Sequence, residues 1–232
     1  MERIFVPTIS GTDWQHLLAK PKLHWKRGYS AMSAAACWED HAPNLPPEIK
    51  IALDASEDES ISQLELLAAI PEWKVDLPGG DRPSQTDILA LTRNEMGLVI
   101  LGVEAKVDET FGPTLGEKKS DASSGQVERI AFLEEELGSP FDDAIRYQLL
   151  HRTVSTLLTA RAFHAAVAVM LVQSFSQTSK WRGDFDAFVG ALNGNAITPD
   201  LFELGTDRSP RLIAGWCTGD EKFLSKVLPS AL

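Results

Sequence analysis

Residues 86–92 (TDILALT) and 98–107 (LVILGVEAKV) are two runs separated by the short segment 93–97 (RNEMG). The first run alternates as a half-buried strand does, and the second is mostly apolar, which is typical of a buried strand. The glycine-bearing segment between them predicts a turn. These stretches therefore predict a β-hairpin at the centre of the protein.

The hairpin brings charged residues to one end of the two strands. If the turn pairs Arg93 with Leu98, the same register places Asp87 directly opposite Glu104. Directly opposed residues share one face of a sheet, with their Cβ atoms about 5 Å apart. Lys106 follows Glu104 by two residues and points to that same face. A slip of one residue would place Asp87 on the opposite face.

Two carboxylates that lie this close repel each other unless they share a cation or a proton. Mg²⁺ or Mn²⁺ suits such a pair, because hard divalent ions prefer oxygen ligands. Such an ion lowers the pKa of a bound water and neutralises charge on a phosphodiester. Lys106 would orient or help to deprotonate that water. The expected chemistry is metal-assisted phosphodiester hydrolysis.

The remaining periodicity predicts further strands and helices around the hairpin. We expect strands at 73–77 and 165–174 and helices at 30–40, from 46 onward, 60–69, 126–137, 142–163 and 181–193. This order predicts an α/β protein with a mixed central sheet flanked by helices. The 232 residues are expected to form a single domain, with a helical N-terminal extension (1–59), a core (60–195) and a C-terminal extension (196–232).

An aspartate on one strand followed by E-x-K on the next resembles the PD-(D/E)XK nuclease superfamily, here through Asp87, Glu104 and Lys106. The resemblance implies a restriction-endonuclease-like αβββαβ core and a Mg²⁺- or Mn²⁺-dependent hydrolase that acts as a DNA nuclease or endonuclease. It also implies metal binding by Asp87 and Glu104, assisted by Glu65 from a helix before the first strand. A homodimer would pair two such sites.

Two features of the chain depart from that pattern. Thr86 stands where many members have proline, and Gln148 is followed four residues later by Arg152 rather than by tyrosine. Gln148 and Arg152 nevertheless lie on one polar stripe of the helix expected at 142–163, and we expect them to contact substrate or water. The alternative for the stripe is the outer face of an amphipathic helix.

The overall charge limits how this protein meets a nucleic acid. A net charge of −11 excludes binding through bulk positive charge, so any contact requires a local basic patch. The run 20–27 (KPKLHWKR) offers one, with Lys26 and Arg27 as candidate substrate contacts. The alternative is a surface loop whose Trp25 is buried in the core.

Composition and the N-terminus favour a cytoplasmic protein with no membrane contact. Two distant cysteines form no metal-ligand or disulfide pattern, and no apolar stretch approaches the ~20 residues that span a bilayer. Two other functions fit the same residues. One is a non-catalytic binding or assembly module that retains the fold, and the other is a metal-dependent hydrolase of small phosphorylated compounds.

Overall fold

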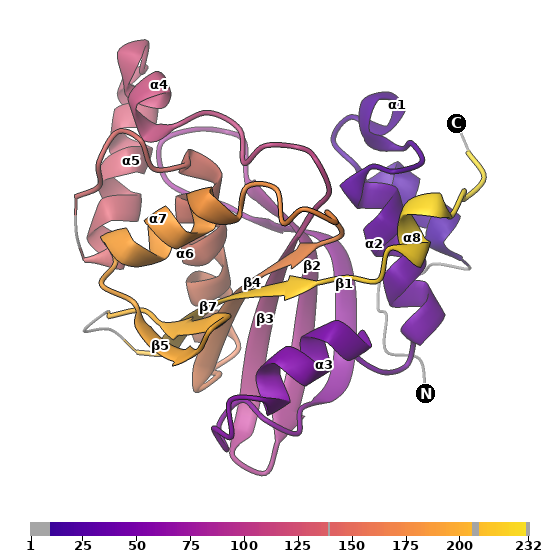
Figure 1. The fold of residues 1–232 in the computed structure, drawn as a ribbon. Coiled ribbons are helices and arrows are strands. Elements are labelled where there is room, and N and C mark those ends of the chain that lie inside the picture. The colour runs from indigo at the N-terminus through magenta and orange to yellow at the C-terminus, as the bar shows by residue number, and fades with distance from the viewer. Residues whose placement is uncertain (1–9, 139, 206–208, 231–232) are drawn as a thin grey trace.

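The computed structural model describes residues 10–138, 140–205 and 209–230, in which seven strands form one mixed sheet with helices on both faces (Figure 1). The strands lie in the order β1-β2-β3-β4-β7-β6-β5. Their bounds are β1 (Glu65–Val75), β2 (Ser84–Asn94), β3 (Gly97–Lys106), β4 (Val167–Ser174), β5 (Asn195–Thr198), β6 (Leu201–Glu203) and β7 (Arg211–Thr218).

The helices precede, interrupt and follow these strands. They are the 3₁₀ helix η1 (Gly11–Leu17), α1 (Pro21–His24), α2 (Ser30–His41), α3 (Pro47–Asp54), α4 (Leu115–Ser120), α5 (Ser124–Leu137), α6 (Tyr147–Ala162), α7 (Arg182–Ala191) and α8 (Lys222–Ser225). Among the helices that the structure describes, we find none with the length and apolar character needed to cross a bilayer.

Strands β1, β2 and β3 form an antiparallel meander. The chain then crosses over through α4, α5 and α6 to β4, which is parallel to β3. Strand β7 is parallel to β4, and β6 and β5 complete the sheet as antiparallel neighbours. Strands β3, β4 and β7 therefore end at the same edge of the sheet.

The alternation of side chains along β3 and β4 divides the core into two layers. Leu101, Val103 and Val169 pack in one cluster with residues of α2 and α3, whereas Ile100 and Met170 pack in another with residues of α5, α6 and α7. Both strands are buried on both faces, which explains their almost continuous apolar sequence. Figure 1 shows the two helical layers on either side of the sheet.

Most of the predicted elements are present. The α/β class, the hairpin strands and the strand at 165–174 are confirmed. Helices also occur where they were expected, as α2, α3, α5, α6 and α7, although α6 begins at Tyr147 rather than at 142.

The helix expected at 60–69 is wrong, because β1 begins at Glu65 and the strand expected at 73–77 is only its end. Burial alternates there: Leu64, Leu66 and Ala68 are buried, while Glu65 is exposed. So short an apolar run fits both the helical and the strand periodicity. The hydrogen bonds with β2 select the strand.

The C-terminal part of the chain also differs from the expectation. Residues 196–232 were expected to form an extension, but they contribute β6 and β7 to the sheet, and β7 lies between β4 and β6. The sequence of β7, RLIAGWCT, is short and contains a glycine, so its local pattern is weak. Residues 211–218 form a central strand because they pair with β4 on one side and with β6 on the other.

Candidate functional site

The predicted hairpin register is confirmed. Arg93 pairs with Leu98, and the ladder continues to the pair of Ile88 with Val103. Asp87 and Glu104 occupy the next position of the same register. The Asp87 carboxylate accepts a hydrogen bond from the backbone N–H of Ala105, with Oδ2 and N 2.8 Å apart. Asp87 thus lies against the end of β3, as the sequence predicted.

Glu104 is the centre of a buried charged cluster. It is 2% exposed, and Lys106 is 5% exposed. Lys106 Nζ donates to Glu104 Oε1 at 2.6 Å, and Gln148 Nε2 donates to the same oxygen at 2.7 Å. Arg152 Nε donates to Oε2 at 2.5 Å. Burial alone would raise the pKa of Glu104, but Arg152 and Lys106 together hold that pKa below its ordinary value.

Helix α6 brings Gln148 and Arg152 to this cluster because it packs closely on β3. A Cβ atom on Gly102 would lie 2.0 Å from Thr156 Oγ1, so only glycine permits this approach. Thr156 is one turn beyond Arg152, and Gly102 is two residues before Glu104 on the same face. The polar stripe on α6 therefore faces the sheet rather than solvent.

A third carboxylate, that of Glu72, belongs to the site and was not predicted. On β1, Pro71 pairs with Ile88 and Trp73 pairs with Thr86, so Glu72 lies at the position opposite Asp87. Its backbone φ is 54°, a left-handed conformation that non-glycine residues rarely adopt. The register between β1 and β2 shifts between Leu66 and Ala68, so a strand assignment for 65–75 would not by itself have placed Glu72 opposite Asp87.

Glu72, Asp87 and Glu104 therefore form a row across β1, β2 and β3, which we call the carboxylate row. Burial and the neighbouring Asp87 raise the pKa of Glu72, although Gln85 Nε2 donates to its Oε2 at 2.6 Å. Burial and the neighbouring Glu104 raise the pKa of Asp87 to about 7. The row holds three acids against the two cations Lys106 and Arg152, so Glu72 and Asp87 retain protons up to near-neutral pH, and a bound cation would replace those protons.

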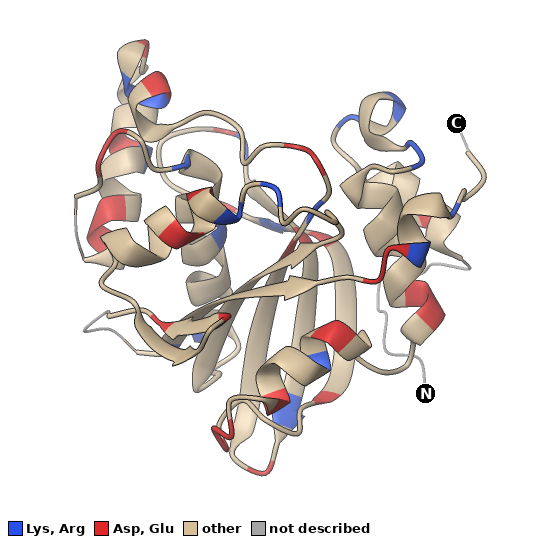
Figure 2. Cartoon of the chain, viewed as in Figure 1, with Lys and Arg blue, Asp and Glu red and all other residues tan. Residues whose placement is uncertain are grey.

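The carboxylate row lines a cavity of about 470 Å³ at the edge of the sheet where β3 and β4 end. In open α/β sheets this edge is where ligands bind. Leu18 and His24 contribute to the lining from the N-terminal segment, and Phe111 and Gly112 contribute from the segment after β3. In Figure 2, acidic and basic segments meet at the upper edge of the sheet, between α1 and α4.

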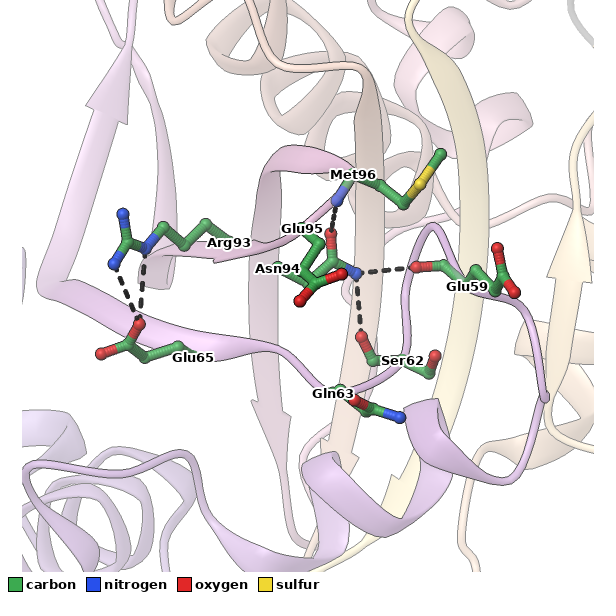
Figure 3. A pocket seen from close by; sticks show the side chains of 8 residues that line it. All are labelled: Glu59, Ser62, Gln63, Glu65, Arg93, Asn94, Glu95 and Met96. Carbon is green, nitrogen blue, oxygen red and sulfur yellow. Dashed lines mark hydrogen bonds and ion pairs between the residues drawn. The ribbon is translucent and has the colours of Figure 1, made fainter.

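The placement of Glu65 as a metal ligand on a helix is wrong. Glu65 lies on β1 opposite Arg93, six residues along β2 from Asp87, which corresponds to about 20 Å. Its carboxylate pairs with Arg93 at 3.3 Å and lines a different cavity of about 590 Å³ near the hairpin turn. Figure 3 shows this pair and the neighbouring Asn94, which holds the segment before β1.

The basic run is only partly involved in the cavity. His24 lines it, whereas Lys26 and Arg27 are exposed and lie outside its lining. The nitrogen of Lys26 lies 5.6 Å from the ring centre of Tyr29. Trp25 is buried, and its indole donates to the carbonyl of Pro229 at 3.2 Å. The role of Lys26 and Arg27 in substrate binding stays a prediction.

Fold and site together define an α/β protein with a charged cavity at the carboxyl ends of its central strands. Residues 7–221 match the family described as Domain of unknown function (DUF6946), and the chain belongs to that family. No curated protein and no solved structure matches the chain.

Proposed function

We propose that this protein is a Mg²⁺- or Mn²⁺-dependent nuclease that hydrolyses phosphodiester bonds in DNA. The observation that carries the proposal is the carboxylate row, with Lys106 beside Glu104 in the same cavity. The connectivity of the sheet adds support. An antiparallel meander followed by helices and a parallel strand is compatible with a restriction-endonuclease-like core.

The donors present fit a divalent ion. Within residues 10–138, 140–205 and 209–230, no three acidic, histidine or cysteine side chains converge into a ready metal site. Mg²⁺, however, is commonly held by one or two carboxylates, with water and substrate completing its shell. Asp87 Oδ1 has no hydrogen-bond partner among the described residues, and a divalent ion would relieve the repulsion between neighbouring carboxylates that raises the pKa of Asp87. Asp87 would hold the ion, with Glu72 or Glu104 as the second carboxylate.

When bound, such an ion supplies Lewis acidity and lowers the pKa of a coordinated water. The chain's own residues have separate tasks. Lys106 is held by Glu104 at 2.6 Å, and in this proposal it would orient an attacking water and stabilise negative charge on the phosphate. Gln148 shares Oε1 of Glu104 with Lys106, and Arg152 holds Oε2, so the carboxylate is fixed at both oxygens. The buried position of this cluster strengthens each of these electrostatic interactions.

One observation favours a second candidate function, a non-catalytic binding module that retains the fold. Both oxygens of Glu104 are already engaged by Lys106, Gln148 and Arg152. A carboxylate satisfied in this way can serve as a structural ion cluster without any metal. Asp87 separates the two candidates, because the close ion pairs of the cluster are made by Glu104, whereas Asp87 makes a hydrogen bond to the Ala105 N–H and no ion pair among the described residues.

The test is calorimetric titration of Mn²⁺ into the wild type, Asp87→Asn and the matched control Glu65→Gln. Glu65→Gln also removes one carboxylate, but at the far end of β1. We expect binding in the wild type and the control and its loss in Asp87→Asn. Hydrolysis of plasmid DNA and of bis(p-nitrophenyl) phosphate should follow the same order. Equal activity in Asp87→Asn and the wild type would overturn the proposal, and faster turnover of the small diester than of DNA would indicate a small-molecule hydrolase.

A further inference from the structure

A second cavity, of about 510 Å³, lies beside the first and shares three of its lining residues. Lys118, Tyr147 and His151 line both cavities and form what we call the junction. The Tyr147 and His151 rings lie 5.0 Å apart between centres, and Lys118 Nζ lies 5.3 Å from the centre of the Tyr147 ring. The three side chains therefore form one contact cluster between the two cavities.

One wall of the second cavity is held rigidly. Arg129 on α5 donates hydrogen bonds of 2.8–2.9 Å to four backbone carbonyls of the segment between β1 and β2, those of Leu77, Pro78, Gly80 and Arg82. Within this segment Gly79 has φ 76°, and a Cβ atom there would lie 2.0 Å from the carbonyl oxygen of Gly125. The cavity is thus a fixed feature of the fold.

Lys118 is a half-buried cation that has no ion pair with an acid among the residues that the structure describes. Its ammonium group lies over the Tyr147 ring and acts electrostatically on His151. The adjacent Lys119 differs, because it pairs with Asp143 at 3.0 Å and with Glu134 at 3.8 Å. An ammonium group that faces two cavities without an acidic partner among the described residues creates a local positive potential, which attracts anions.

His151 adds a hydrogen-bond donor of fixed direction. Ser84 Oγ lies 2.8 Å from His151 Nδ1, and Arg152 Nη1, which can only donate, lies 3.1 Å from Ser84 Oγ and 3.5 Å from Nδ1. Nδ1 is therefore an acceptor, and the ring proton is on Nε2. Burial and the nearby cations, Arg152 first, hold the pKa of His151 well below its ordinary value, so the ring stays neutral and donates from Nε2.

We propose that the junction is a second anion subsite that takes a phosphate group of the DNA strand next to the phosphodiester bound at the carboxylate row. The ligand's identity rests on the proposed function. A lysine, a phenol and an imidazole N–H are donors that suit the oxygens of a phosphate, and such contacts position a nucleic acid without reading its sequence. Because the two cavities share these lining residues, a single DNA strand can contact both of them.

The test compares thymidine 3′,5′-bisphosphate with thymidine 5′-monophosphate by calorimetry in the presence of Mn²⁺. Neither ligand contains a phosphodiester bond, so turnover does not interfere. We expect the wild type to bind the bisphosphate at least tenfold more tightly. Lys118→Met should reduce this preference to threefold or less, and Tyr147→Phe should reduce it in part. Lys119→Met is the matched control and should keep the full preference, and equal thermal unfolding midpoints would show that all variants are folded.

Two results would overturn the subsite: a wild type without preference for the bisphosphate, or the same loss in Lys119→Met as in Lys118→Met. Hydrolysis of bis(p-nitrophenyl) phosphate separates this inference from the proposed function. A wild type that hydrolyses the diester but shows no preference refutes the subsite alone. A wild type that shows the Lys118-dependent preference but hydrolyses no diester with any divalent ion refutes the nuclease alone.

Discussion

Replacing Asp87 by asparagine is expected to stabilise the fold at alkaline pH while it abolishes metal binding. Asp87 lies beside Glu104 in a half-buried position, and burial and this neighbour raise its pKa to about 7. The Asp87 carboxyl group therefore binds its proton more tightly in the native protein than in the unfolded chain. The stability contributed by the proton is fully present below the ordinary pKa near 4 and is lost as the pH rises to about 7.

The size of the effect follows from that difference in pKa. A rise from 3.8 to about 7 is roughly three pKa units, and each unit corresponds to about 1.4 kcal/mol, which gives a ceiling near 4 kcal/mol. Partial exposure screens the charge, so we expect about 1–2 kcal/mol in favour of Asp87→Asn at pH 8. The asparagine oxygen still accepts from the Ala105 N–H, so no backbone hydrogen bond is lost.

The assay is urea unfolding followed by circular dichroism at pH 5 and at pH 8. At pH 5 the difference should be less than about half of its value at pH 8, since the native wild type still holds the proton on Asp87 whereas the unfolded chain, with its ordinary pKa of 3.8, has already released most of it. Asp76→Asn, at an exposed position just after β1, is the control and should show no comparable change between the two pH values. An Asp87→Asn protein less stable than wild type at pH 8, or a difference independent of pH, would refute the reasoning.

Three further predictions follow from the same structure. Glu104→Gln should cost about 3 kcal/mol at pH 7 in urea unfolding because it leaves buried cations without their partner, and this cost should shrink as the pH falls through the lowered native pKa of Glu104. Gly102→Ala should destabilise by about 1–3 kcal/mol through its contact with Thr156, and adding Thr156→Ala should recover part of the loss in the same assay; simple additivity would contradict this packing argument. Glu65→Gln removes an exposed pair with Arg93 and should change stability by less than about 0.5 kcal/mol, with Mn²⁺ binding by calorimetry unchanged; a loss of Mn²⁺ affinity would restore Glu65 to the site.

The hairpin and part of the site were predictable because their signals are local. The turn at 93–97 fixes the register, and the register by itself places Asp87 opposite Glu104. The helical spacing of Gln148 and Arg152 likewise put both side chains on one stripe. Which way that stripe faced was not local information, because it depends on the close approach of α6 to Gly102.

The errors arose where neighbours in space decide the structure. Residues 65–75 fit a helix or a strand in isolation, and pairing with β2 selects the strand. As a result Glu72, and not Glu65, lies beside Asp87 in the site. The position of β7 between β4 and β6 could not be predicted from its short sequence.

The sequence by itself thus determined the α/β class, the central hairpin and the juxtaposition of Asp87, Glu104 and Lys106, because turn chemistry and side-chain periodicity act over a few residues. Only the tertiary structure decided that Glu72 completes the carboxylate row and that Lys118 and His151 stand between two cavities. The physical reason is that strand order and helix docking are set by burial between segments far apart in the chain.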